Sequence, residues 1–173
     1  MTRRTRADIL HAGELDAQQR YNPAGMWPDA AVDRMFKQAI DEETAFFIES
    51  LGFFFIATAD SHGHCDCSFR GTEPGADGAN QPAVIVADAK TLVYPDYRGN
   101  NLYNSIGNIL QNPHIGMLFI DFPTAQRLRV NGTVEIVEEP GAYYPIWTSA
   151  LRYMRVTVNQ VFGNCSKRIP KIG

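Results

Sequence analysis

The sequence lacks any uninterrupted apolar run of the roughly 18 residues that a membrane-spanning helix requires. It also lacks a basic excess, since the 173-residue chain carries a formal net charge of −3. A protein that follows nucleic-acid phosphates needs a clear surplus of lysine and arginine, so we expect no nucleic-acid partner. Three cysteines, an odd number, argue against a disulfide framework. Apolar residues make up 45% of the chain, which is enough for one globular core.

Arginines open the chain at positions 3, 4 and 6, and a double arginine near the start can mark an exported protein. No apolar segment follows them, because charged residues such as Asp8 and Glu14 come next. We therefore expect no signal peptide, no membrane partner and a cytoplasmic protein.

The usual signatures of nucleophilic and phosphate-loop chemistry are missing. The chain has no Gly-x-Ser-x-Gly elbow, no Gly-x-x-x-x-Gly-Lys loop and no Gly-x-Gly-x-x-Gly fingerprint. The densest set of metal-ligand types is His62, His64, Cys65 and Cys67. On a strand, His64 would point away from both cysteines, so we expect buried structural thiols and no metal site. Cys165 has no candidate base nearby, and no catalytic residue is assigned.

Residues 1–52 have a helical pattern, with apolar side chains three or four positions apart. Asp41-Glu42-Glu43 starts a helix with acidic residues in the first turn, where the helix dipole favours them, and Gly52 ends it. We expect this segment to cover a barrel formed by residues 53–173, with the whole chain, 1–173, as a single domain.

From Phe53 onward the pattern changes to strands. A continuous apolar run at 53–59 predicts a strand buried on both faces, and 64–70 alternates. Further strand segments are 83–87 and 91–95, expected as a hairpin, and 114–121, 127–136 and 154–158. Asn131-Gly132 could form a hairpin turn. The alternation keeps its phase across this pair, however, so we predict one long strand with glycine at a close backbone approach.

The remaining segments link these strands. Residues 71–82 are expected as a loop, 100–111 as a helix, and 140–152 as a short helix. The helix at 100–111 would carry Leu102, Ile106, Ile109 and Leu110 on its apolar stripe. Six or so strands, one mid-chain helix and helical ends predict a mainly β (α+β) fold, a six-stranded antiparallel barrel with flanking helices.

A group of arginine and polar residues is the most informative feature for function. Ser68 and Arg70 share one face of a strand, residues 98–101 lead into a helix, and Arg127 and Arg129 share one face of a later strand. Arginine holds phosphate through paired donors, serine adds a hydroxyl, and a helix start adds backbone N–H groups. Taken singly, each arginine reads as a solvated charge or an ion-pair partner. Grouped around the turn at 98–101, they predict a phosphate-binding corner.

Three stretches in order, 55–71, 94–119 and 128–134, resemble the pyridoxamine 5′-phosphate oxidase-like family of flavin-nucleotide-binding proteins. The ordered match covers about residues 53 to 137. The resemblance implies a split β-barrel, a homodimer, and FMN in a groove at the subunit interface. It also implies cofactor-binding residues, which are Ser68, Arg70, Arg98, Asn100, Asn101, Ser105, Gln126, Arg127 and Arg129.

The chain departs from the vitamin-processing oxidases of that family at its end, where it carries neither their tryptophan-containing segment nor their Arg-Leu motif. Pyridoxamine phosphate is therefore not an expected substrate. The resemblance favours an FMN-dependent oxidoreductase, in which the flavin does the redox chemistry and no protein nucleophile is needed. The alternatives are a non-enzymatic flavin carrier or sensor, a related barrel that uses the deazaflavin F420 or haem, and a structural dimerisation domain. His62, His64 and His114 are the available haem ligands.

Overall fold

The computed structural model describes residues 3–139, 143–163 and 167–170. It divides into two compact units, Met1–Lys37 and Gln38–Gly173. No helix in the described part of the chain is long and apolar enough to cross a membrane. That the chain forms one domain, with its N-terminal helices over the barrel, stays a prediction.

The first unit is helical, as predicted, but in short pieces: α1 (Arg6–Ile9), α2 (Ala12–Tyr21), the 3-10 turn η1 (Pro23–Gly25) and α3 (Asp29–Met35). The side chain of His11 caps α2 by accepting hydrogen bonds from the backbone N–H groups of its first turn. The Arg4 side chain ties the unit together, because its Nε donates to Asp33 Oδ1 at 2.8 Å. The helices are interrupted at the two prolines: η1 begins at Pro23, and α3 begins directly after Pro28.

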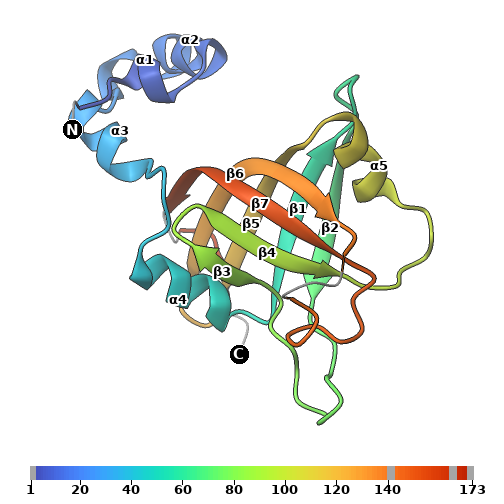
Figure 1. Cartoon of the computed structure of the whole chain (residues 1–173). Helices are drawn as coiled ribbons and strands as arrows, with labels where there is room; N and C mark the ends of the chain where they lie inside the picture. The colour runs from blue at the N-terminus through green and yellow to red at the C-terminus, as the bar shows by residue number, and fades with distance from the viewer. Residues whose placement is uncertain (1–2, 140–142, 164–166, 171–173) are drawn as a thin grey trace. The chain divides into compact units, whose positions relative to one another are not determined.

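The second unit holds one antiparallel sheet in the order β2-β1-β5-β6-β7-β4-β3 (Figure 1). Its strands are β1 (Phe53–Ala59), β2 (Cys65–Gly71), β3 (Ile85–Asp88), β4 (Thr91–Asp96), β5 (His114–Asp121), β6 (Gln126–Val137) and β7 (Arg152–Gly163). The predicted α+β class with an antiparallel sheet is confirmed. The described sheet has seven strands rather than six, and the expected hairpin, now β3 and β4, forms its edge beside β7.

Strand β1 shows why the core has one inner face. Its alternate residues Phe54, Ile56 and Thr58 are buried, whereas Phe53 and Phe55 are half-buried. The prediction that this run is buried on both faces is therefore wrong. Neighbouring aromatic rings lie over the outer face of β1, such as Phe69, whose ring centre lies 5.5 Å from that of Phe53. A sheet with its helices on one side leaves the other side without a packing layer.

Helix α4 (Glu42–Ser50) forms where the acidic turn at 41–43 predicts it, and it lies against one end of the inner face. Asp41 caps it by accepting from the backbone N–H of Thr44 at 3.0 Å. Ile48 is fully buried in the core. On the same helix, Glu49 Oε1 accepts a hydrogen bond from the Val86 N–H at 2.7 Å, which satisfies a donor of the edge strand β3.

Helix α5 (Asn104–Gln111) begins four residues later than predicted. The reason is that Asn101 (φ 63°) and Tyr103 (φ 56°) adopt the left-handed conformation, which a right-handed helix does not contain. The predicted apolar stripe is only half right. Ile106 and Ile109 are buried, whereas Leu102 and Leu110 are 71% and 74% exposed.

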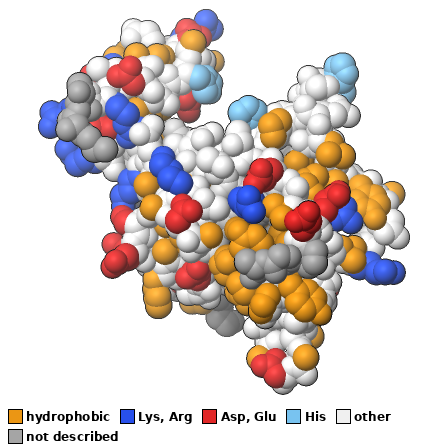
Figure 2. All heavy atoms as spheres, viewed as in Figure 1, with side chains coloured by type: hydrophobic (Ala, Val, Ile, Leu, Met, Phe, Trp, Pro, Cys, Tyr) orange, Lys and Arg blue, Asp and Glu red, His pale blue; other side chains and the backbone are white. Residues whose placement is uncertain are grey.

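Residues 143–151 form turns, so the predicted helix at 140–152 is wrong for its described part; residues 140–142 lie outside the described residues. Pro145 lacks the N–H that a helix interior needs. Trp147 anchors the segment instead: it is fully buried against Tyr153 and Val93, and its Nε1 donates to the Pro82 carbonyl at 2.6 Å. Hydrophobic side chains gather on this face of the molecule, around β4 and the loops beside it (Figure 2).

The prediction of a single long strand through Asn131-Gly132 is confirmed, because β6 runs unbroken from Gln126 to Val137. A Cβ at Gly132 would lie 2.3 Å from the Thr157 carbonyl oxygen of β7. The pairing of β6 with β7 shifts register at this same point. Glycine therefore allows the two longest strands to approach each other closely.

Candidate functional site

A cleft of about 390 Å³ opens beside β2, where β4 ends and the chain turns into α5. Its volume is in the range of small-molecule sites. Its lining is largely polar and comes from β2, from the segment that joins β4 to α5, and from Leu151. The residues are Asp66, Cys67, Ser68, Arg70, Asp96, Tyr97, Gly99, Asn100, Asn101, Leu102, Tyr103, Asn104, Ser105, Ile106 and Leu151.

Strand β2 directs three polar side chains toward this region. Asp66, Ser68 and Arg70 pair in register with Thr58, Ile56 and Phe54, the residues of β1 that face the core. Residues opposite each other in an antiparallel pair project from the same face of the sheet. Because β2 is an edge strand, polar side chains on its inner face reach the end of the barrel without being sealed in the core.

An ion-pair array lies at the floor of the cleft. Asp96 is 7% exposed and stands between two arginines, with Arg70 Nη1 at 3.4 Å from Oδ1 and Arg152 Nε at 3.4 Å from Oδ2. Burial raises the pKa of Asp96, and the two guanidinium groups oppose that shift. Arg70 belongs to one edge strand of the sheet and Asp96 to β4 near the opposite edge, so the pair joins the two ends of the sheet.

Two groups near this array are buried without a hydrogen-bond partner among the described residues: Arg70 Nε and the Tyr94 hydroxyl. Burial raises the pKa of Tyr94, so its hydroxyl stays protonated at neutral pH. A buried donor without an acceptor is costly, by about 1–3 kcal/mol. Unsatisfied groups of this kind beside a cleft are candidates for ligand contacts.

The loop from β4 to α5 forms one wall. Asn100 Oδ1 accepts from the Leu102 N–H at 3.0 Å, and the residues on either side of Leu102 are left-handed. A bulky residue such as Tyr103 rarely adopts this conformation, and strained backbone of this kind concentrates at functional sites. The loop leads directly into the first turn of α5, whose leading N–H groups have no partner within the helix.

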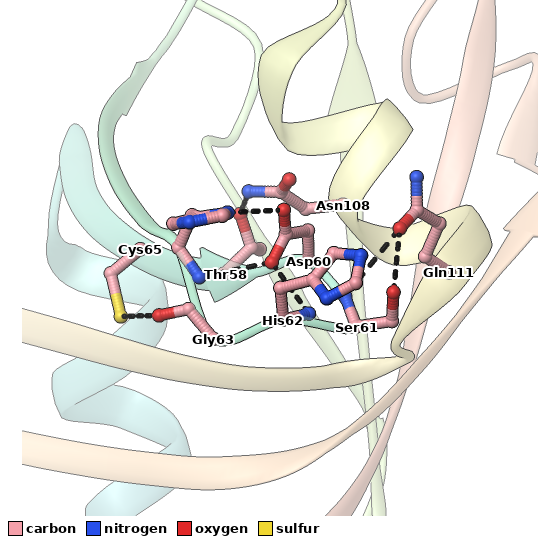
Figure 3. Close-up of polar contacts among 9 residues, drawn as sticks. Thr58, Asp60, Ser61, His62, Gly63, Cys65, Asn108 and Gln111 are labelled. Carbon is pink, nitrogen blue, oxygen red and sulfur yellow. Dashed lines mark hydrogen bonds and ion pairs between the residues drawn. The ribbon is translucent and has the colours of Figure 1, made fainter.

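Helix α5 is tied to the strands below it by polar contacts. Ser105 is buried, and its Oγ donates to Asp66 Oδ2 at 3.4 Å. Asn108 donates to Thr58 Oγ1 at 3.1 Å (Figure 3). These two contacts turn the polar side of α5 toward β1 and β2.

The structure brings five of the nine predicted cofactor-binding residues to this cleft: Ser68, Arg70, Asn100, Asn101 and Ser105. Arg98 is exposed and does not line it. The other three, Gln126, Arg127 and Arg129, lie on β6 and do not line it either. Register places Arg127 and Arg129 on the outer face of the sheet, beside Ile120 and Leu118.

Sequence reasoning missed several residues of the site. Asp66 alternates with Ser68 and Arg70, which was a usable signal. The sequence around Arg152 contains no such signal, because only the pairing of β4 with β7 brings Arg152 opposite Asp96.

The turn between β1 and β2 forms a separate polar cluster (Figure 3). Asp60 accepts from the backbone N–H groups of His62 and His64 and pairs with the His64 ring at 2.8 Å. Hydrogen bonding from His64 and His62 lowers the pKa of Asp60. These contacts stabilise the hairpin turn.

Cys65 and Cys67 are exposed free thiols, so the prediction of buried thiols is wrong. On β2 they share the outer face with Phe69, which is itself exposed. No cluster of three His, Cys, Asp or Glu side chains in the described part of the chain is placed to hold a metal ion. Cys165 lies outside the described residues.

The fold, α+β with a mostly antiparallel sheet, is that of a split β-barrel. The chain matches the family described as pyridoxamine 5′-phosphate oxidase over residues 40–169 and belongs to that family. No curated protein sequence matches the chain.

Among the solved structures that share the fold, two serve as examples. HupZ from Group A Streptococcus is 22% identical, with a TM-score of 0.54, and the match covers 78% of this chain and 99% of HupZ. A candidate pyridoxamine 5′-phosphate oxidase from Lactobacillus delbrueckii is 17% identical, with a TM-score of 0.55, and the match covers 73% and 95% of the two chains.

Proposed function

We propose that the chain binds FMN in the cleft, acts as a homodimer, and is an FMN-dependent oxidoreductase. The observation that carries this proposal is the meeting of Arg70, Ser68 and the strained loop before α5 in one polar cleft. Membership of the pyridoxamine 5′-phosphate oxidase family supports it.

The residues of the cleft fit a phosphorylated flavin. Arg70 offers a buried Nε–H without an acceptor, and Ser68 and the first turn of α5 add neutral donors. Two acidic residues oppose an anion here, Asp66 and Asp96. Asp96 is shared by two arginines, so the array of Arg70, Asp96 and Arg152 keeps one net positive charge.

The flavin would supply the hydride or electron transfer, and the chain would bind and orient it. The absence of a catalytic triad signature in the sequence suits this division of work. Tyr97 also lines the cleft, and burial raises its pKa to about 12. It is therefore a neutral hydroxyl at physiological pH, and it donates to Gln81 Oε1 at 3.3 Å, which leaves its oxygen lone pairs as acceptors toward the cleft.

A homodimer would explain the uncovered outer face of the sheet. Phe53, Phe55 and Phe69 form a ring cluster there, and Phe69 is 60% exposed. Arg127 and Arg129 lie on the same face, so a partner subunit would bring them within reach of a cleft that its neighbour contributes. The outer face of a second copy is thus our proposed occupant of this surface.

The dimer is tested by analytical ultracentrifugation of the wild type and Phe69→Lys. We expect a dimer for the wild type and a monomer for the variant, which should keep the native circular dichroism spectrum because Phe69 is exposed. A wild type that sediments as a monomer contradicts this part of the proposal.

The cofactor is tested by the visible absorption spectrum of the purified protein, before and after reconstitution with FMN. We expect two flavin bands for the wild type and for Arg155→Ala, a matched control whose arginine pairs with Glu135 outside the cleft. Arg70→Ala should remain folded by circular dichroism and lose the flavin. A wild type that ignores FMN, or an Arg70→Ala protein that retains all of it, contradicts the assignment.

The same samples separate the alternatives. Exchange with F420 or a Soret band would identify a different cofactor on the same barrel. Bound FMN that stays oxidised with every pyridine nucleotide tried would favour a flavin carrier or sensor over an oxidoreductase.

A further inference from the structure

Arg152 makes two contacts that link opposite sides of the cleft. Its Nε lies 3.4 Å from Asp96 Oδ2, and its guanidinium carbon lies 5.6 Å from the centre of the Tyr103 ring. Arg152 itself does not line the cleft, whereas both of its partners do. Arg152 would therefore act on a ligand in the cleft only through Asp96 and Tyr103.

The contact between Arg152 and Asp96 is linked to Arg70, because Asp96 pairs with both arginines. Asp96 holds Arg152 with one carboxylate oxygen and Arg70 Nη1 with the other, at 3.4 Å each. A carboxylate between two guanidinium groups fixes the direction of both. If Arg152 is removed, Asp96 gains freedom to turn, and the orientation of the Arg70 guanidinium is no longer determined from both sides.

The contact between Arg152 and the Tyr103 ring involves the loop that joins β4 to α5. Tyr103 has a strained, left-handed backbone. Its side chain is 48% exposed, so little packing holds this conformation in place. An arginine over an aromatic ring within about 6 Å is an attractive cation–π arrangement. The ring of Tyr103 is thereby held toward β7 while the neighbouring residues line the cleft.

We propose that Arg152 is a positioning residue of the cleft: it orients Arg70 through Asp96 and the β4–α5 loop through Tyr103, and so sets the preference for a phosphorylated ligand. This inference rests on the proposed flavin function for its ligand, though not for its geometry. A lysine cannot replace Arg152, because an ammonium group lacks the planar fork that contacts a carboxylate and stacks on a ring together.

The first experiment needs no ligand. The Arg70 Nε–H is buried, so its nitrogen–proton signal should be visible by NMR in the wild type; Arg70→Lys assigns it. We expect the signal to shift and to exchange faster in Arg152→Ala and in Arg152→Lys, and to stay unchanged in Arg155→Ala. Arg155 is the matched control, since it is also an ion-paired arginine of β7. An unchanged Arg70 signal in Arg152→Ala overturns the proposal.

The second experiment compares FMN with riboflavin, which lacks the phosphate, by flavin fluorescence titration. Arg152→Ala and Arg152→Lys should weaken FMN about tenfold more than riboflavin, the effect of one lost charge-assisted contact. Equal weakening of the affinity for both flavins overturns the positioning role. Wild-type FMN affinity in Arg152→Lys also overturns it, because lysine keeps the charge and lacks the planar guanidinium group. If the wild type binds neither flavin, the proposed function fails while the NMR result still decides the role of Arg152.

Discussion

Gly132→Ala tests the close approach of β6 and β7, on which the position of Arg152 and of the cleft depends. The added Cβ would lie 2.3 Å from the Thr157 carbonyl oxygen and 3.1 Å from its carbonyl carbon. Both atoms belong to backbone, so no flexible side chain can move aside, and the two longest strands must separate. Overpacking of this kind costs about 3 kcal/mol.

A domain of this size is stable by about 5–15 kcal/mol, so the change removes a large part of the total. Urea denaturation followed by circular dichroism measures it. With a slope of about 2 kcal/mol/M, the midpoint should fall by about 1.5 M.

Gly107→Ala is the matched control, because it adds the same methyl group in α5, where nothing lies within 4 Å of the new Cβ. Removing glycine from a helix interior stabilises by up to about 1 kcal/mol, so its midpoint should rise. If Gly132→Ala changes the free energy of unfolding by less than about 0.5 kcal/mol, the reasoning from the backbone contact is wrong.

Three further predictions concern single side chains. Trp27 is 58% exposed and Trp147 fully buried, so Trp27→Phe should shift the tryptophan emission maximum to shorter wavelength; a shift to longer wavelength contradicts the burial of Trp147. Tyr97 has a folded pKa of about 12 against an ordinary 10, so the stability it contributes is complete below pH 10 and is lost as pH rises toward 12. Tyr97→Phe should make that fall in denaturation midpoints shallower, while Tyr94 and Tyr153, whose pKa values are also raised, keep part of it; an unchanged slope refutes the contribution of Tyr97. Asp60 has a lowered pKa, so it contributes stability above about pH 4 that is lost on further acidification; His64→Ala should flatten this acid limb, measured by thermal melts from pH 2 to 6.

Local chemistry in the sequence predicted most of the elements. The continuous apolar run at 53–59 and the alternation at 127–136 marked strands, Asp41 marked a helix start, and Gly132 marked a close approach, because each of these signals acts over a few residues. The polar alternation of Ser68 with Arg70 likewise predicted a shared face, which the register with β1 places on the core side.

The tertiary structure decided what those signals could not. Which face of β1 and β2 is covered depends on where the helices pack, so burial of Phe53 and of the thiols at 65 and 67 was mispredicted. The start of α5 depended on two left-handed residues that composition does not reveal. Asp96 lies 26 positions after Arg70 and 56 positions before Arg152 along the chain. Only the closing of the sheet edges brings the three residues together. Contacts between residues so distant in sequence are set by strand order and register, which no local pattern encodes.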